Sequence, residues 1–258
     1  MCYASALGDC GGRRLTFEHY FSKGILKLLS VREIGGFPWQ SDRNRPSIDT
    51  LGAKILCEKH HRLLSPLDQA AVQVFRFFDQ YVPDVVSGWR TNHVVVEMKG
   101  ELLERWMLKA LIGVTASGNV LRDGIAIREY QPLREDLEIL FGRARMRAEL
   151  HHGLYLDPRT GETTRLTERG LHFQPFFYGD RVCGATCRIN NICFGLLISG
   201  DRSDLNHPLR NSEYRPPGVQ VMNWARPSCS AELRLTWSRP GSNTGLKLWW
   251  VQPQTLTG

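Results

Sequence analysis

The spacing of apolar residues changes twice along the chain, and these changes divide it into three parts. Residues 1–66 show little periodic apolar pattern but are rich in Gly, Cys and His, which is typical of a small module that needs a metal to fold. Residues 67–160 repeat apolar side chains at helical spacing, and residues 161–258 contain short aromatic and β-branched runs separated by turn residues. The sequence therefore predicts an α+β protein with an N-terminal module, a helical middle region and a β-rich antiparallel C-terminal region.

The N-terminal module is expected to contain two strands, each leading into a helix. The segment 15–30 changes from a strand pattern into a short helix pattern, and the strand-like run 53–57 leads into a helix that starts near His60. Between them, Gly35–Pro46 is rich in turn residues and predicts a loop.

Three helices and one strand are expected in the middle region. Pro66 and Asp68 are suited to opening the first helix, and 100–118 predicts the second. The third is expected over Leu133–Leu150, and the run 93–99 predicts a strand between the first two helices.

Arg143, Arg145 and Arg147 fall near the end of the expected third helix. Cations there complement the helix dipole, and this interpretation is preferred to a ridge that binds phosphate.

Composition and charge indicate which kind of partner and which compartment to expect. The chain has 258 residues, a net charge of +7 and a pI near 9.2, which favours an anionic partner such as nucleic acid. Its apolar runs are shorter than the roughly 18–20 residues that cross a bilayer, and no signal-peptide pattern follows Met1. We therefore expect a cytoplasmic protein without a membrane partner.

Seven cysteines are too many by one for complete disulfide pairing, so metal ligands and buried thiols are expected instead. Cys183, Cys187, Cys193 and Cys229 lie in strand-like surroundings, which favour buried thiols over a second metal site.

Four residues of the N-terminal module have the chemistry of a structural zinc site. Cys57 and His60 are spaced to reach one ion from a turn that enters a helix. Cys2 and Cys10 are the opposing pair, although seven residues separate them, more than is usual.

A second group of residues suggests a reactive site beside this zinc. Glu18 precedes His19, and His61 follows His60 directly. A carboxylate and a histidine can hold a hard cation while a second histidine takes a proton from water, which suffices in principle for phosphodiester hydrolysis.

The segments "CGGRRLTFEHYFSKGIL" and "LCEKHHRLLSPLD" resemble the zinc-containing branch of the HNH endonuclease family. The resemblance implies a ββα-metal finger braced by zinc in the first quarter of the chain. It assigns His19 as the general base, Glu18 and His61 as ligands of a catalytic Mg²⁺ or another divalent cation, and the zinc to these residues: Cys2, Cys10, Cys57 and His60. The family's central Asn has no counterpart about nine residues before His61, and Asn44 lies further upstream.

These residues and this resemblance predict two alternative functions from different classes. The first is a metal-dependent endonuclease, with DNA as the expected substrate and His19 as the base. The alternative is a treble-clef zinc module that has lost the chemistry and binds nucleic acid or a protein partner. A structural protein of a phage or mobile element is a third alternative, and the sequence leaves the oligomeric state open.

Overall fold

The computed structural model describes residues 1–12, 14–29, 34–35, 51–89, 92–117, 121–122, 125–126, 131–157, 170–179, 181–200, 207–239, 241 and 245–250. Within these residues the helical elements are η1 (Tyr3–Leu7), α1 (Lys23–Leu28), α2 (Glu58–Arg76), η3 (Phe77–Tyr81), α3 (Val82–Ser87), α4 (Gly100–Ala116), α5 (Arg134–Leu140) and η4 (Ala148–Leu150). The strands are β1 (Leu15–His19), β2 (Ile34–Gly35), β3 (Gly52–Cys57), β4 (His93–Lys99), β5 (Leu121–Arg122), β6 (Ile125–Ala126), β7 (Gly153–Leu156), β8 (Leu171–Tyr178), β9 (Arg181–Ile189), β10 (Ile192–Leu197), β11 (Glu213–Tyr214), β12 (Gly218–Asn223), β13 (Ser230–Thr236) and β14 (Leu246–Trp250).

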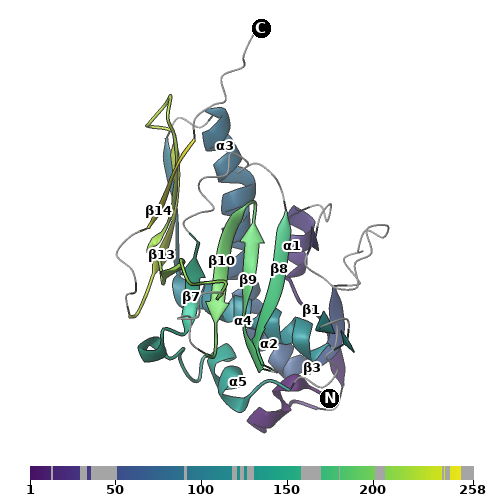
Figure 1. Cartoon of the computed structure of the whole chain (residues 1–258). Coiled ribbons are helices and arrows are strands. Elements are labelled where there is room, and N and C mark those ends of the chain that lie inside the picture. The colour runs from purple at the N-terminus through teal and green to yellow at the C-terminus, as the bar shows by residue number, and fades with distance from the viewer. Residues whose placement is uncertain are drawn as a thin grey trace.

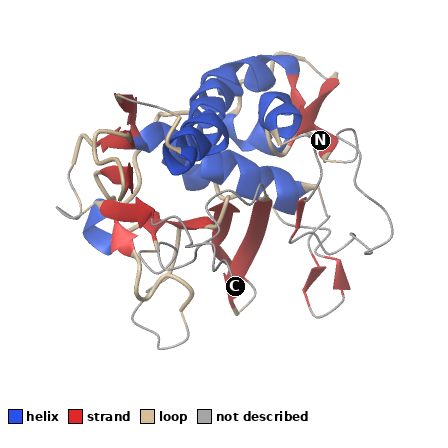
Figure 2. Cartoon of the chain, turned by 90° about the horizontal axis from the view of Figure 1, so that it is seen from above, coloured by secondary structure: helices blue, strands red, loops and turns tan. Residues whose placement is uncertain are grey.

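Two larger sheets and two small ones make up the β structure. The six-stranded sheet has the order β11-β7-β10-β9-β8-β2, and the four-stranded sheet has the order β14-β12-β13-β4. Most pairs are antiparallel, but β2–β8, β12–β14 and β4–β13 are parallel. Figure 1 shows β8, β9 and β10 in front of α2 and α4, and Figure 2 shows the helices gathered on one side of these strands. The mixed α+β class is thereby confirmed.

Helix α4 is the centre of the hydrophobic core. Its run from Trp106 to Thr115 is buried, and the Trp106 ring packs edge-on against Phe75 at a centroid distance of 5.6 Å. The core cluster around it extends from Cys2 to Leu235. Strand β4 completes the sheet of β12–β14, and the expected boundary at residue 66 falls inside α2. The three expected regions therefore share one core, and the middle and C-terminal regions share a sheet.

Two expected helix boundaries are wrong. Pro66 does not open a helix, because α2 begins at Glu58 and continues past the proline. The third helix does not reach Leu150. It ends at Leu140, because Gly142 adopts a left-handed φ of 73° and its N–H binds the carbonyl of Ile139, which terminates the helix.

The arginines expected at the end of that helix therefore lie beyond it, so the helix dipole does not account for them. Most of the loop expected over Gly35–Pro46, together with Asn44, lies outside the described residues. Among the helices that the structure describes, none is long and apolar enough to cross a bilayer.

Candidate metal centre and charge cluster

The strand pair β1–β3 and the helix α2 form the scaffold of the site. The two strands are antiparallel, with Leu15 opposite Cys57 and His19 opposite Gly52. Helix α2 starts immediately after Cys57, so the second strand delivers one cysteine and the first turn of the helix delivers His60. This is a ββα arrangement closed by η1 at the N-terminus, whose residues pack against the same core.

Cys2, Cys10, Cys57 and His60 come together, as the spacing predicts. Their sulfur and nitrogen atoms all lie within 4.8 Å of one another. The His60 Nδ1 atom is 3.6, 3.8 and 3.2 Å from the sulfurs of Cys2, Cys10 and Cys57, respectively. A tetrahedral zinc with bonds of about 2.3 Å to sulfur and about 2.0 Å to nitrogen would hold such atoms roughly 3.5 Å apart. The three thiols and one imidazole therefore fit one metal ion.

The pKa values of the three cysteine thiols also agree with a site that binds a cation. Burial raises the pKa of the Cys2 thiol, and desolvation together with the neighbouring Cys2 raises the pKa of Cys10 to about 12. Burial opposes ionisation of Cys57 as well, but backbone N–H groups from His60 and Gly11 lower its pKa overall. Without a cation, the repulsion among three thiolates keeps the cluster partly protonated, so metal binding must displace protons.

Asp9 lies beside this cluster and contacts His60. The sequence pattern does not predict this role, although Asp9 directly precedes Cys10. Because Nδ1 of His60 faces the sulfurs, its Nε2–H donates to Asp9 Oδ1 at 2.9 Å. The same carboxylate accepts from Lys59 at 3.0 Å and from Arg143 at 2.6 Å. A carboxylate on the second nitrogen fixes the tautomer of a metal-binding histidine and strengthens it as a ligand.

Replacing Asp9 with Asn is therefore expected to weaken metal binding by about 10–100-fold, because the imidazole loses its anionic partner. Competition with a chromophoric chelator measures this affinity. Asp84→Asn, on α3 at the other end of the molecule, is the control and should bind as the wild type does. An unchanged affinity in Asp9→Asn would remove Asp9 from the metal centre.

Glu18 and His61 also come together, in a second cluster. His61 Nδ1 lies 2.5 Å from Glu18 Oε2. The other oxygen of Glu18 lies 2.6 Å from Nζ of Lys109, a residue of α4, and this ammonium also donates to both oxygens of Asp68 at 2.7 and 2.8 Å. The Lys109 and Glu18 side chains are only 2% and 4% exposed.

Burial and the neighbouring charges together determine the pKa values in this cluster. Burial alone would raise the pKa of Glu18, but His61 and Lys109 together lower it. The contact with Glu18 raises the pKa of His61, and burial raises that of Asp68. With His61 protonated, two carboxylates face two cations, so the charges balance, with Glu18 and Lys109 buried and His61 and Asp68 partly exposed. The sequence signal for this cluster is a lone lysine within the apolar run of α4.

His19 lies on the other face of β1. Neighbouring side chains of a strand point in opposite directions, so Glu18 is directed towards α4 while His19 is directed away from it. There the His19 ring packs edge-on against Phe17 at 5.1 Å. The role of His19 as a general base stays a prediction.

The cysteines of the C-terminal region do not form a second metal centre within the described residues. Cys183, Cys187 and Cys229 are buried and Cys193 is partly buried, and none belongs to a group of potential ligands. Buried thiols are therefore the better interpretation, as expected. Trp249 and Trp250 belong to β14, but their side chains lie outside the described part of the structure.

Comparisons with known proteins add no assignment: no family model, no curated protein and no solved structure matches this chain. The functional argument therefore depends on the geometry of the two clusters.

Proposed function

We propose that this protein binds nucleic acid through a zinc-braced ββα module in which a buried lysine takes the place of a catalytic cation. Zn²⁺ is held by Cys2, Cys10, Cys57 and His60, a donor set that suits a closed structural site because all four positions come from the protein. The zinc ties η1 to the junction of β3 and α2 and so holds the first quarter of the chain together.

The observation that carries the proposal is the position of Lys109. A divalent cation that acts on a phosphodiester must touch its carboxylate ligand and remain open to the substrate. Glu18 is almost fully buried, and the Lys109 ammonium fills the space between it and Asp68. An ammonium held by three carboxylate oxygens supplies the positive charge internally, where no substrate reaches it.

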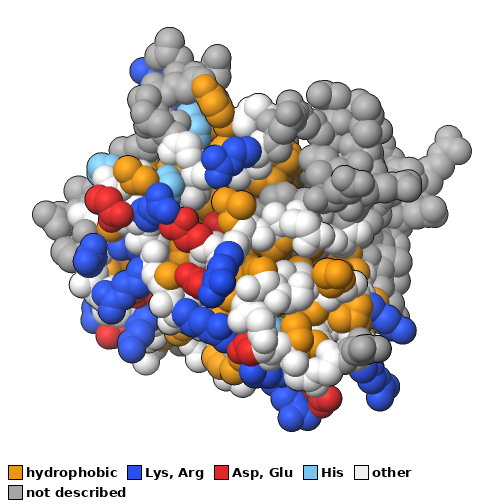
Figure 3. Space-filling model, turned by 90° about the horizontal axis from the view of Figure 1, so that it is seen from below, with side chains coloured by type: hydrophobic (Ala, Val, Ile, Leu, Met, Phe, Trp, Pro, Cys, Tyr) orange, Lys and Arg blue, Asp and Glu red, His pale blue; other side chains and the backbone are white. Residues whose placement is uncertain are grey.

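Support for nucleic acid as the partner comes from charge and from the resemblance of this module. The chain has a net charge of +7. Lys59, Arg62 and Arg143, around the metal centre, keep between 43% and 77% of their side chains exposed. Figure 3 shows many Lys and Arg side chains over the lower face of the molecule, with fewer acidic ones between them. Exposed cations of this kind bind the phosphate backbone without sequence preference.

The endonuclease remains the second candidate, because one contact favours it. Glu18 and His61, the residues that the resemblance pairs at a catalytic cation, lie 2.5 Å apart. Mg²⁺ or another divalent cation would have to displace Lys109 from Glu18, with His19 acting as the base.

A combined binding and cleavage experiment separates the two candidates. Zinc-loaded protein is mixed with labelled single-stranded and double-stranded DNA and RNA, with and without Mg²⁺ or Mn²⁺. The variants are His19→Ala and, as a control, His172→Ala, an exposed histidine on β8. We expect binding that weakens with rising salt and no cleavage by any of the three proteins.

Cleavage by the wild type and His172→Ala that is lost in His19→Ala would instead establish the nuclease. The absence of binding to all four nucleic acids would overturn the proposal.

A further inference from the structure

A cavity of about 690 Å³ opens at the N-terminal end of α4. Its walls come from the end of β4, the first turns of α4, the segment after α5, and the residues that follow β11 and β13. The volume falls within the range of about 300–1,000 Å³ in which proteins bind small organic ligands.

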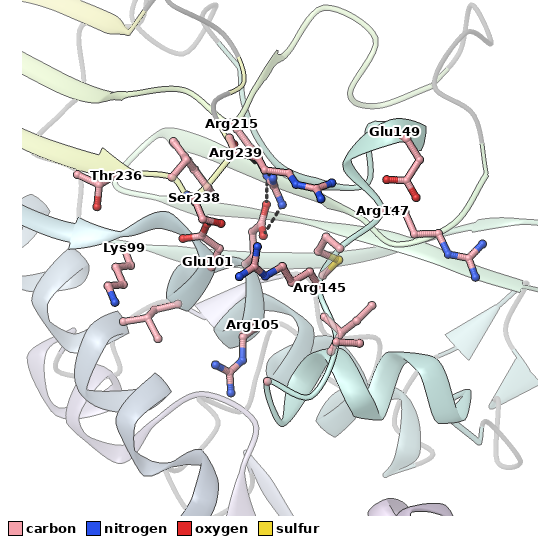
Figure 4. A pocket seen from close by; sticks show the side chains of 17 residues that line it. Lys99, Glu101, Arg105, Arg145, Arg147, Glu149, Arg215, Thr236, Ser238 and Arg239 are labelled. Carbon is pink, nitrogen blue, oxygen red and sulfur yellow. Dashed lines mark hydrogen bonds and ion pairs between the residues drawn. The ribbon is translucent and has the colours of Figure 1, made fainter.

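Cationic side chains predominate in the lining. Six are present: Lys99, Arg105, Arg145, Arg147, Arg215 and Arg239. Against these stand three acids, Glu101, Glu104 and Glu149, and Arg147 pairs with Glu135 outside the lining at 2.6 Å, which leaves a formal excess of two positive charges. Figure 4 shows these cations on several sides of the pocket.

The acids of the lining are largely engaged within the protein. Glu104 is buried and pairs with Arg215 at 2.8 Å, and it also accepts from the N–H of Leu154. Glu101 accepts from both the backbone N–H and the hydroxyl of Ser238 at 2.7 Å. Glu104 is thereby compensated by Arg215, whereas Glu101 bonds neutral donors and keeps its negative charge in the lining.

Lys99, Arg145 and Arg239, by contrast, make no ion pair with any residue in the described part of the chain. Mutual repulsion among uncompensated cations around one cavity favours an anion between them. Arginine is well suited to this because its planar guanidinium donates two parallel hydrogen bonds to phosphate.

The helix itself adds to the positive potential. Helix α4 has 17 residues, and no side chain caps its N-terminus, where Lys99 is the N-cap residue. The positive end of the helix dipole favours negative charge at this end, and the Glu101 carboxylate in the first turn supplies part of it by accepting from its own backbone N–H.

An apolar wall lies beside these cations. Trp237 packs so closely on Gly100 that a Cβ atom there would lie 2.3 Å from its ring, and the Arg215 guanidinium lies 5.3 Å from the ring centroid. Leu102, Ile139 and Met146 extend this wall. A cavity with apolar sides and a few convergent charges suits a ligand that has both a flat ring and an anionic group.

We propose that this cavity binds a phosphate-bearing ligand of nucleotide size, with its phosphates at Lys99 and Arg145. The ligand is either a free nucleotide or the phosphorylated end of a nucleic acid strand, which share this chemistry. The cavity is separate from the metal centre, and ligand binding there does not depend on the function proposed for the metal centre.

Calorimetric titration of the zinc-loaded full chain tests the proposal. The probes are ATP, AMP, adenosine, pyrophosphate, and a short oligonucleotide with or without a 5′-phosphate. Arg145→Gln and Lys99→Gln change exposed side chains and so should leave the fold intact, which the melting temperature verifies. Arg188→Gln, an exposed arginine on β9, is the matched control.

We expect ATP, or the 5′-phosphorylated oligonucleotide, to bind the wild type and the Arg188→Gln control equally. Each pocket variant should weaken this binding about tenfold or more, since each removes a charged hydrogen-bond donor. Adenosine should not bind. Preference for the phosphorylated oligonucleotide over ATP would identify a strand end as the ligand.

Failure of every phosphate-bearing probe to bind at millimolar concentration would overturn the proposal. Equal binding by all variants would also overturn it. Neither result depends on the cleavage and binding experiment at the metal centre, because that experiment alters His19 and not this cavity.

Discussion

Replacing Cys57 with Ser is expected to abolish the metal site and produce the largest loss of stability in this protein. Cys57 is buried, and its sulfur is the closest of the three to His60, at 3.2 Å. Without this thiolate the remaining three ligands do not close a tetrahedral structural site. We expect zinc content to fall from about one ion per chain to near zero, and the free energy of unfolding to fall by more than about 4 kcal/mol.

Cys193→Ser is the matched control for this experiment. Cys193 is a partly buried cysteine on β10 and belongs to no group of potential ligands. Elemental analysis and chemical denaturation of both variants give the comparison, and the control should keep its zinc. Full zinc content in Cys57→Ser would show that the cluster is not the metal site.

Replacing Lys109 with Met is expected to destabilise the fold by about 3–5 kcal/mol at neutral pH. The side chain is nearly isosteric, so packing around α4 is preserved. The change removes the ammonium from the buried carboxylate of Glu18 and the partly buried one of Asp68, and breaking a buried ion pair from one side leaves uncompensated charge in the core. Denaturation by urea measures the difference.

The pH dependence of this loss identifies its cause. In the wild type the pKa of Glu18 is lowered, so its contribution to stability is present above its unfolded value of about 4.3 and is lost as pH falls through the folded value. Without Lys109, burial raises the pKa of Glu18 and Asp68, and protonation then relieves the repulsion. The destabilisation should therefore shrink as pH falls from 7 towards 5.

Lys54→Met provides the control, because Lys54 is an exposed residue of β3. It should change the free energy of unfolding by no more than about 0.5 kcal/mol. A Lys109→Met protein as stable as this control at pH 7 would show that the ion cluster is not intact in solution. If Lys109→Met also gained cleavage with Mg²⁺, the freed carboxylate would be a latent cation site.

Local patterns predicted most of the secondary structure, and the errors have local causes. The alternation in 53–57 and 93–99 matches β3 and β4, and the helical spacing in 100–118 matches α4. Proline favours the first turn of a helix, so Pro66 predicts a helix start, but it lies within α2, which packs on α4. Gly142 was overlooked as the end of α5 because apolar spacing continues beyond it.

The metal ligands illustrate what spacing can and cannot predict. Cys57 and His60 are three residues apart at a strand-to-helix junction, so their proximity follows from local geometry. The participation of Cys2 and Cys10 depends on the path of η1, and the structure confirms that they meet the other pair. Asp9 was missed because a carboxylate beside a cysteine has no distinctive pattern until a histidine faces it.

The amino-acid sequence was sufficient to predict the α+β class, the proximity of Cys57 and His60 and the positive charge of the chain, because each follows from residue type and short-range spacing. Long-range packing established two further features. It placed Lys109 of α4 between Glu18 and Asp68, which precede it in the chain by 91 and 41 residues, and it brought Lys99, Arg145 and Arg239 around one cavity. Neither arrangement has a local pattern, because each arises only when α4 is buried between α2 and the two sheets.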